Sequence, residues 1–72
     1  MVTLQDTRDA LSDRWQTTIE VAKAVPRTSR TFNVHKQQVY SALRRLAEDG
    51  EAEWARAGNE AIWRRIRWPR RC

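Results

Sequence analysis

The sequence predicts an α+β domain in which three helices precede a β-hairpin. Three segments repeat apolar residues at helical spacing, and the second and third end at Pro26 and Gly50, which stop helices. Two later segments alternate apolar and polar residues on either side of the turn-forming stretch 57–60. With 72 residues there is room for one small domain, which we place at 1–67, followed by a basic tail at 68–72.

Composition narrows the function classes. Hydrophobic residues make up 40% of the chain and charged residues 32%, which is typical of a globular protein. No apolar run approaches the ~18 residues of a membrane span, and residues 1–13 lack the basic start and apolar block of a signal peptide. A single cysteine, Cys72, excludes an internal disulfide. With only one histidine as well, we expect no metal site and no cofactor.

The net charge of +5 is divided unevenly along the chain. Residues 21–47 carry six basic residues and no acid, and residues 61–72 carry five arginines and no acid. The nine acids lie in 1–20 and 48–60, with only three basic residues among them. Nucleic acid, anionic lipid and acidic proteins are the candidate partners of such basic segments. A single polyanion can use both segments only if they lie on one face.

The first two helices are predicted from one apolar stripe and one capping motif. The first is expected over 5–15, with Thr3 or Asp6 near its N-cap, from the apolar residues Leu4, Ala10, Leu11 and Trp15. The run Thr17-Thr18-Ile19-Glu20 has the Ser/Thr-x-x-Glu form of a capping box, in which two side chains satisfy backbone N–H groups. The second helix is therefore expected over 18–25, ending before Pro26.

The third helix is the longest and is expected over 35–49. The preceding residues 26–33 are rich in turn-forming types and predict a loop, with Phe32 as its one apolar anchor. Gly50 provides the C-terminal stop. Helical spacing relates the apolar residues Val34, Val39, Ala42, Leu43 and Leu46.

The hairpin is predicted from short strands at 51–56 and 61–67. The side-chain phase of the second strand is ambiguous. Ile62 and Ile66 share one side of it, and Trp63 takes the other side unless a bulge intervenes.

The four tryptophans allow two interpretations. We expect Trp15, Trp54 and Trp63 in the core, because so small a domain needs large apolar groups. The alternative is that they are stacking platforms for single-stranded nucleic acid. Trp68 is expected to be a contact or an oligomer surface.

Residues 33–46 carry the pattern on which the functional interpretation rests. Its members are Val34, the polar run from His35 to Gln38, then Val39, the Leu43-x-x-Leu46 pair and the closing Gly50. This pattern resembles the recognition-helix segment of bacterial winged helix-turn-helix regulators, and the predicted hairpin lies where those families have their wing. The resemblance covers about residues 17–67 and implies a winged helix-turn-helix that binds DNA. One departure is a stretch between the second and third helices that is several residues longer than the tightest turns.

An exposed helix surface of this kind fits the major groove, where side chains meet base edges. With Val39, Leu43 and Leu46 facing the core, the polar residues of the third helix occupy its remaining surface. We expect contacts to base edges from Gln37, Gln38 and Ser41. Base or phosphate contacts are expected from Lys36, Tyr40 and Arg44, with Arg45 on the same polar surface. Replacing Gln38 with alanine is expected to relax base preference with little effect on folding. His35 is expected to cap the helix or to contact phosphate.

Further contacts to the phosphate backbone or the minor groove are expected from three other regions. The start of the second helix contributes Thr17 and Thr18, as caps, as phosphate contacts or as both. The loop before the third helix contributes Arg27 and Arg30. The hairpin and tail contribute Arg56, Arg64, Arg65, Arg67, Arg70 and Arg71.

The sequence thus predicts sequence-specific binding of double-stranded DNA without enzymatic activity. The expected role is a small transcriptional regulator or an architectural factor resembling an excisionase, in the cytoplasm and associated with the nucleoid. We expect no membrane partner and no small-molecule ligand, and binding to DNA as a homodimer or in paired copies. The alternative is a winged helix used for protein contact, with the acids of 48–53 at the interface, or for RNA binding.

Overall fold

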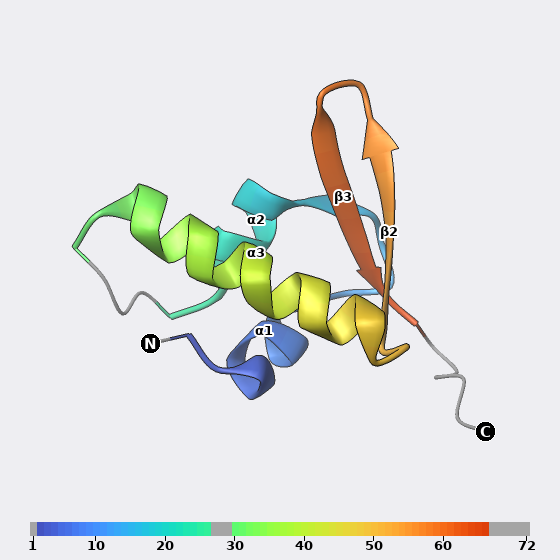
Figure 1. Ribbon diagram of the computed structural model, residues 1–72, viewed down its shortest axis with the longest axis horizontal. Coiled ribbons are helices and arrows are strands. Elements are labelled where there is room, and N and C mark those ends of the chain that lie inside the picture. Colours follow the sequence, from blue (N-terminus) through green and yellow to red (C-terminus); the bar gives the residue numbers. More distant parts are fainter. Residues whose placement is uncertain (1, 27–29, 67–72) are drawn as a thin grey trace.

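The computed structural model describes residues 2–26 and 30–66 and confirms an α+β domain with three helices followed by an antiparallel hairpin. The elements are α1 (Leu4–Ala10), β1 (Gln16–Thr17), α2 (Thr18–Ala24), α3 (Phe32–Glu48), β2 (Ala52–Ala57) and β3 (Glu60–Arg65). The long α3 crosses the molecule, and the turn end of the hairpin β2–β3 projects away from the helices (Figure 1). Both pairings in the three-stranded sheet are antiparallel, in the order β1-β3-β2.

The first helix is shorter than the sequence predicts. Thr3 is its N-cap and accepts a hydrogen bond from the N–H of Asp6 at 3.0 Å, as expected, but α1 ends at Ala10 rather than at 15. Beyond Leu11 the N–H of Ser12 donates instead to the side-chain Oε1 of Gln16 at 3.0 Å. This local bond replaces a helical one, because serine and its polar neighbours offer the backbone partners outside a helix.

The predicted capping box of α2 is confirmed. The Thr17 hydroxyl accepts from the N–H of Glu20 at 3.2 Å, and the Glu20 carboxylate accepts from the N–H of Thr17 at 3.1 Å. The helix ends at Ala24, one residue before the predicted end at 25. A short strand that the sequence did not predict, β1, precedes it and pairs with β3.

The third helix begins three residues earlier than predicted. Phe32 was assigned to the loop, but it starts α3 and packs against the core. Its ring lies 6.1 Å from that of His35, between centroids, so an apolar contact within the first turn favours the early start. At the other end Gly50 has a φ of 79°, and the N–H of Glu51 donates to the Leu46 carbonyl at 2.9 Å, which closes the helix as the sequence predicts.

The hairpin register resolves the ambiguous phase of its second strand. Trp54 lies opposite Trp63, and Ala55 lies opposite Ile62. The pairing runs without a bulge from Ala52 opposite Arg65 to Ala57 opposite Glu60. Trp63 therefore faces α3 while Ile62 points to the other side of the sheet. The expected turn is confirmed at residues 58–59, where Gly58 has a φ of 64°.

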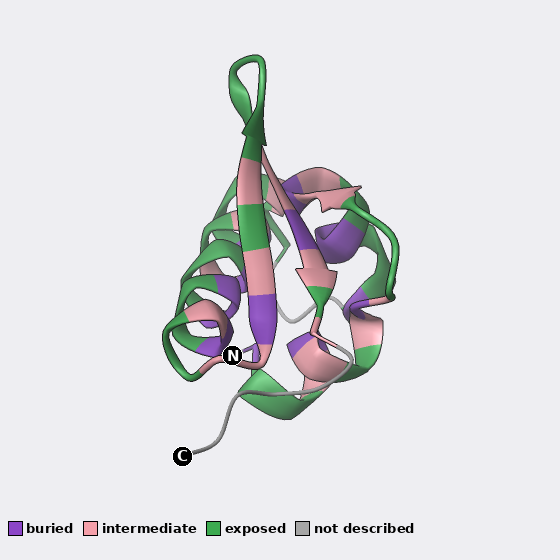
Figure 2. Cartoon of the chain, turned by 90° about the vertical axis from the view of Figure 1, so that its right-hand side faces the viewer, coloured by how far each residue is buried: buried purple, intermediate pink, exposed green. Residues whose placement is uncertain are grey.

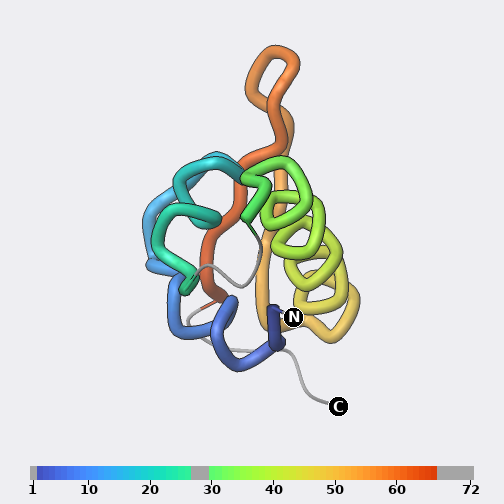
Figure 3. The backbone as a smooth tube through the Cα atoms, turned by 90° about the vertical axis from the view of Figure 1, so that its left-hand side faces the viewer, coloured from blue at the N-terminus to red at the C-terminus, as the bar shows by residue number. Residues whose placement is uncertain are grey.

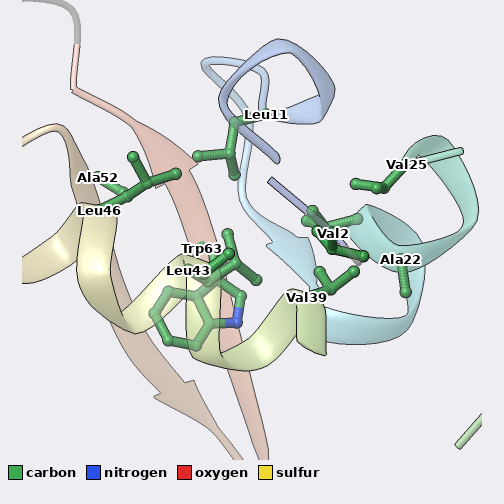
Figure 4. Packing of buried hydrophobic residues seen from close by; sticks show 11 residues of the cluster. Val2, Leu11, Ala22, Val25, Val39, Leu43, Leu46, Ala52 and Trp63 are labelled. Atoms are coloured by element: carbon green, nitrogen blue, oxygen red, sulfur yellow. The ribbon is translucent and has the colours of Figure 1, made fainter. Parts of the chain in front are cut away.

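The core lies between α3, α2 and the base of the hairpin (Figure 4). Val39, Leu43 and Leu46 are fully buried, as predicted, and so is Trp63, whose Nε1 donates to the Thr18 hydroxyl at 2.9 Å. Burial is concentrated at the base of the hairpin and gives way to exposed positions toward its turn (Figure 2).

The predictions for the other two described tryptophans are wrong. Trp15 is 40% exposed and Trp54 is 58% exposed. Trp15 packs on the side of the sheet that faces away from α3, where the Arg64 guanidinium lies 4.5 Å from its ring centroid. Trp54 lies beside Trp63 on the edge strand β2, on the α3 side of the sheet, and lines a groove there that leaves much of its ring exposed.

Candidate functional site

One exposed stripe of α3 collects polar side chains opposite the buried ones. We call it the α3 face, and it consists of Lys36, Gln37, Tyr40, Ser41 and Arg44. Together with Thr18 of α2, the first four of these residues line a shallow hollow. A second hollow joins Lys36 to Asn59 and Glu60 at the hairpin turn. The α3 face thus lies between the start of α2 and the hairpin, whose turn projects past both helices (Figure 3).

The α3 face is basic, and its cationic side chains are available to an anionic ligand. From Lys36 to Arg44 the sequence contains no acid. Within residues 2–26 and 30–66, neither of these two cations forms an ion pair, and the same holds for Arg56 on β2. Two acidic residues flank the α3 face: Glu60 lines the hollow beside Lys36, and Glu48, one turn beyond Arg44, lines a groove together with it.

Most other acids of the predicted acidic segment are already paired. Asp49 lies 3.6 Å from Arg45, and Glu53 lies 2.7 Å from Arg64. Glu51 accepts two hydrogen bonds from Arg8, each of 3.0 Å, and this bonding raises the pKa of the Arg8 guanidinium above its ordinary value. Of these pairs, Arg8–Glu51 ties α1 to the segment before β2, Arg64–Glu53 lies across the hairpin, and Arg45–Asp49 lies within the end of α3.

The expectation for His35 is wrong. Its side chain is fully buried, and its Nε2 lies 2.7 Å from the carbonyl oxygen of Ala22. Since a carbonyl only accepts, Nε2 carries the proton and donates, while Nδ1 has no partner among the described residues. His35 therefore ties α3 to α2 and does not reach a phosphate. Its position one helical turn before Val39, in the core stripe, is the sequence signal that identifies this role.

Three further predicted residues serve the fold. Gln38 is half-buried on the edge of α3 toward the N-terminal segment, where its Oε1 accepts from the N–H of Val2 at 3.3 Å. Because of this contact we now expect Gln38→Ala to lower the stability of the fold. Thr17 caps α2. Thr18 is buried and accepts from Trp63, which leaves it little surface for a phosphate.

The predicted arginines divide among several surfaces. Arg45 lies on the edge of α3 away from the α3 face, beside Asp49. Arg64 lies on the sheet side away from α3, and Arg65 donates to the backbone carbonyl of Arg8. Arg30 is exposed just before α3. The predicted contacts at Arg27, Arg67, Arg70 and Arg71, and the contact at Trp68, lie outside the described residues.

Of the second basic segment, 61–72, the described arginines Arg64 and Arg65 do not join the α3 face, and the hairpin arginine that does is Arg56. Arg56 lies on the same side of β2 as Trp54, because side chains two apart on a strand share a side. Trp54 and Arg44 line one groove between α3 and β2, so Arg56 extends the basic surface of α3 onto the hairpin. The alternation of β3 places Arg64 on the opposite side.

No protein-family model, no curated protein and no solved structure matches this chain. In residues 2–26 and 30–66 no helix is both long and apolar enough to cross a membrane. The same part of the chain brings together no group of three side chains of the metal-binding types His, Cys, Asp and Glu.

Proposed function

We propose that this chain is a winged helix-turn-helix domain that binds double-stranded DNA, with α3 in the major groove and the β2–β3 hairpin as the wing. The observation that carries the proposal is the α3 face. It presents polar and basic side chains on one exposed stripe, with Lys36 and Arg44 free of ion pairs in the described part of the chain. An α-helix fits the major groove, where such side chains reach base edges and phosphates.

The residue types of the α3 face suit sequence-specific readout. Gln37 is exposed and has the paired donor and acceptor that match adenine. Lys36 and Arg44 match guanine or phosphate oxygens. Ser41, between them, is short enough to bring the helix close to the bases. Such a domain serves as a small transcriptional regulator or an architectural factor at the nucleoid, and it binds as a homodimer or in paired copies for tight specificity.

We further propose that the chain performs no catalysis. Its single histidine is buried with Nε2 occupied by a backbone carbonyl, so the commonest acid–base group is not accessible to a substrate.

The competing proposal, a protein-contact domain, is weakened by the pairing of its expected acidic patch. Asp49, Glu51 and Glu53 all lie in ion pairs or hydrogen bonds with arginines of the same chain. RNA is a poorer fit than DNA, because the A-form major groove is too deep and narrow for a helix.

Two adjacent arginines provide the test. Arg44 and Arg45 are both exposed and belong to the same helix, but only Arg44 lies on the α3 face. We expect the wild type to bind a labelled random duplex with an affinity that falls steeply between 50 and 200 mM salt, measured by fluorescence anisotropy. Arg44→Ala should lower the slope of log affinity against log salt by about one.

Arg45→Ala is the matched control, since it removes the same charge from the other edge of α3. It should leave both the affinity and the salt slope nearly unchanged. Absence of duplex binding by the wild type, or equal effects of the two substitutions, contradicts the proposed use of the α3 face.

A further inference from the structure

A groove between the second half of α3 and the strand β2 holds two exposed aromatic side chains. Its volume is about 590 Å³, and its lining consists of Tyr40, Arg44, Ala47, Glu48, Ala52, Glu53, Trp54 and Trp63. Trp54 is 58% exposed and Tyr40 is 41% exposed. Both rest on the buried Trp63, with ring centroids 6.2 Å and 5.7 Å from its own. The core thus fixes the position of an aromatic surface that faces solvent.

The charges around the groove differ between its rim and its interior. Arg44 lines it from α3, and Arg56 follows Trp54 on the same side of β2, so cations lie on both sides of the aromatic surface. Glu48 also lines the groove. Glu53 contributes to the lining as well, but its side chain points to the other side of β2, where Arg64 binds the carboxylate. Carboxylates repel a phosphate, whereas the arginines attract one. The groove therefore favours a neutral, flat group that is attached to a polyanion.

An unpaired nucleobase on a DNA strand has these properties. A base within an intact duplex is stacked on both sides and has no free face for Trp54. A base in a bulge or overhang has such a face, and little energy is needed to move it out of the stack. Aromatic side chains between cations are the usual platforms for such bases, whatever the sequence.

We propose that this groove binds one unpaired nucleobase, stacked on Trp54, while the neighbouring phosphates lie against Arg44 and Arg56. The proposal rests on the proposed function and extends it. The preferred ligand is a duplex interrupted by an unpaired base next to the segment that α3 contacts. The free energy of stacking one base on an aromatic side chain corresponds to an affinity gain of about 5- to 150-fold.

The experiment compares three labelled duplexes by fluorescence anisotropy at fixed salt. One is fully paired, one carries a single-base bulge, and one carries an abasic sugar in place of the bulged base. We expect the wild type to bind the bulged duplex about 5- to 150-fold more tightly than the other two. The abasic duplex controls for bending, because it bends the DNA without offering a base.

Trp54→Ala should abolish the preference for the bulged duplex and leave binding of the fully paired duplex within a few-fold. Trp15→Ala is the matched control, since Trp15 is also exposed but lies on the other side of the sheet, and it should keep the preference. Circular dichroism of each variant checks that the domain remains folded.

Equal binding of bulged and abasic duplexes, or a preference that survives in Trp54→Ala, overturns this inference. If paired duplex still binds and Arg44→Ala still lowers the salt slope, the proposed function stands without it, and the aromatic groove is then a surface for another macromolecule such as a protein. If no duplex binds at all, the proposed function itself fails.

Discussion

On α3 two pairs of identical neighbours, one of glutamines and one of arginines, are divided between the two edges of the helix and have different surroundings. Gln37 and Arg44 lie on the exposed α3 face, without an ion pair for the arginine in the described part of the chain. Their sequence neighbours Gln38 and Arg45 lie on the other edge, where one binds the backbone of Val2 and the other lies beside an aspartate. One residue along a helix is a rotation of about 100°. That rotation determines whether a side chain remains available to a ligand or is used by the fold.

The inner side of α3 should be far more sensitive to substitution than either edge. Leu43→Ala removes a fully buried side chain from the centre of the core and should lower the free energy of unfolding by about 2–5 kcal/mol. Ser41→Ala, on the α3 face, should change it by less than about 0.5 kcal/mol. Urea unfolding followed by circular dichroism measures both. Similar unfolding midpoints for the two variants contradict the assignment of Leu43 to the core.

The next effect in size is expected on the α3 face. Gln37→Ala should reduce discrimination between the preferred base pair and its competitors by about 1–3 kcal/mol, because one bidentate contact is lost. The urea midpoint should be unchanged, since Gln37 is exposed. The preferred site is first selected from a random duplex pool and then varied one base pair at a time. An unaltered preference at every position would assign Gln37 to solvent and not to the bases.

Local chemistry made several parts of this fold predictable. The capping box of α2 depends on four consecutive residues, and the hairpin turn depends on Gly58, whose φ of 64° suits glycine. The core stripe through Val39 and Leu43 follows from helical spacing alone. Each of these signals lies within a few residues, so it can be recognised in the sequence without knowledge of the tertiary structure.

The errors concern contacts between distant segments. The exposure of Trp54 depends on how far the helical layer extends over the hairpin, which no local pattern records. The burial of His35 depends on a carbonyl of α2, 13 residues earlier in the chain. The end of α1 was predicted too late, because Trp15 matched its apolar stripe while its actual partner, Arg64, comes from β3. The sequence also assigned too many residues to the DNA-binding surface of α3. Helical spacing does not reveal the contacts of Gln38 with Val2 and of Arg45 with Asp49.

The sharpest remaining test of the comparison is Gln38→Ala, which should act oppositely to Gln37→Ala. The substitution removes the 3.3 Å acceptor of the Val2 N–H and should lower the free energy of unfolding by about 0.5–1.5 kcal/mol. Val2 is itself buried, so its N–H has limited access to replacement water. Affinity for the selected duplex and base preference should stay unchanged below the unfolding transition. The reverse result, intact stability with relaxed base preference, would place Gln38 on the DNA-binding surface and remove the distinction between the two edges of α3.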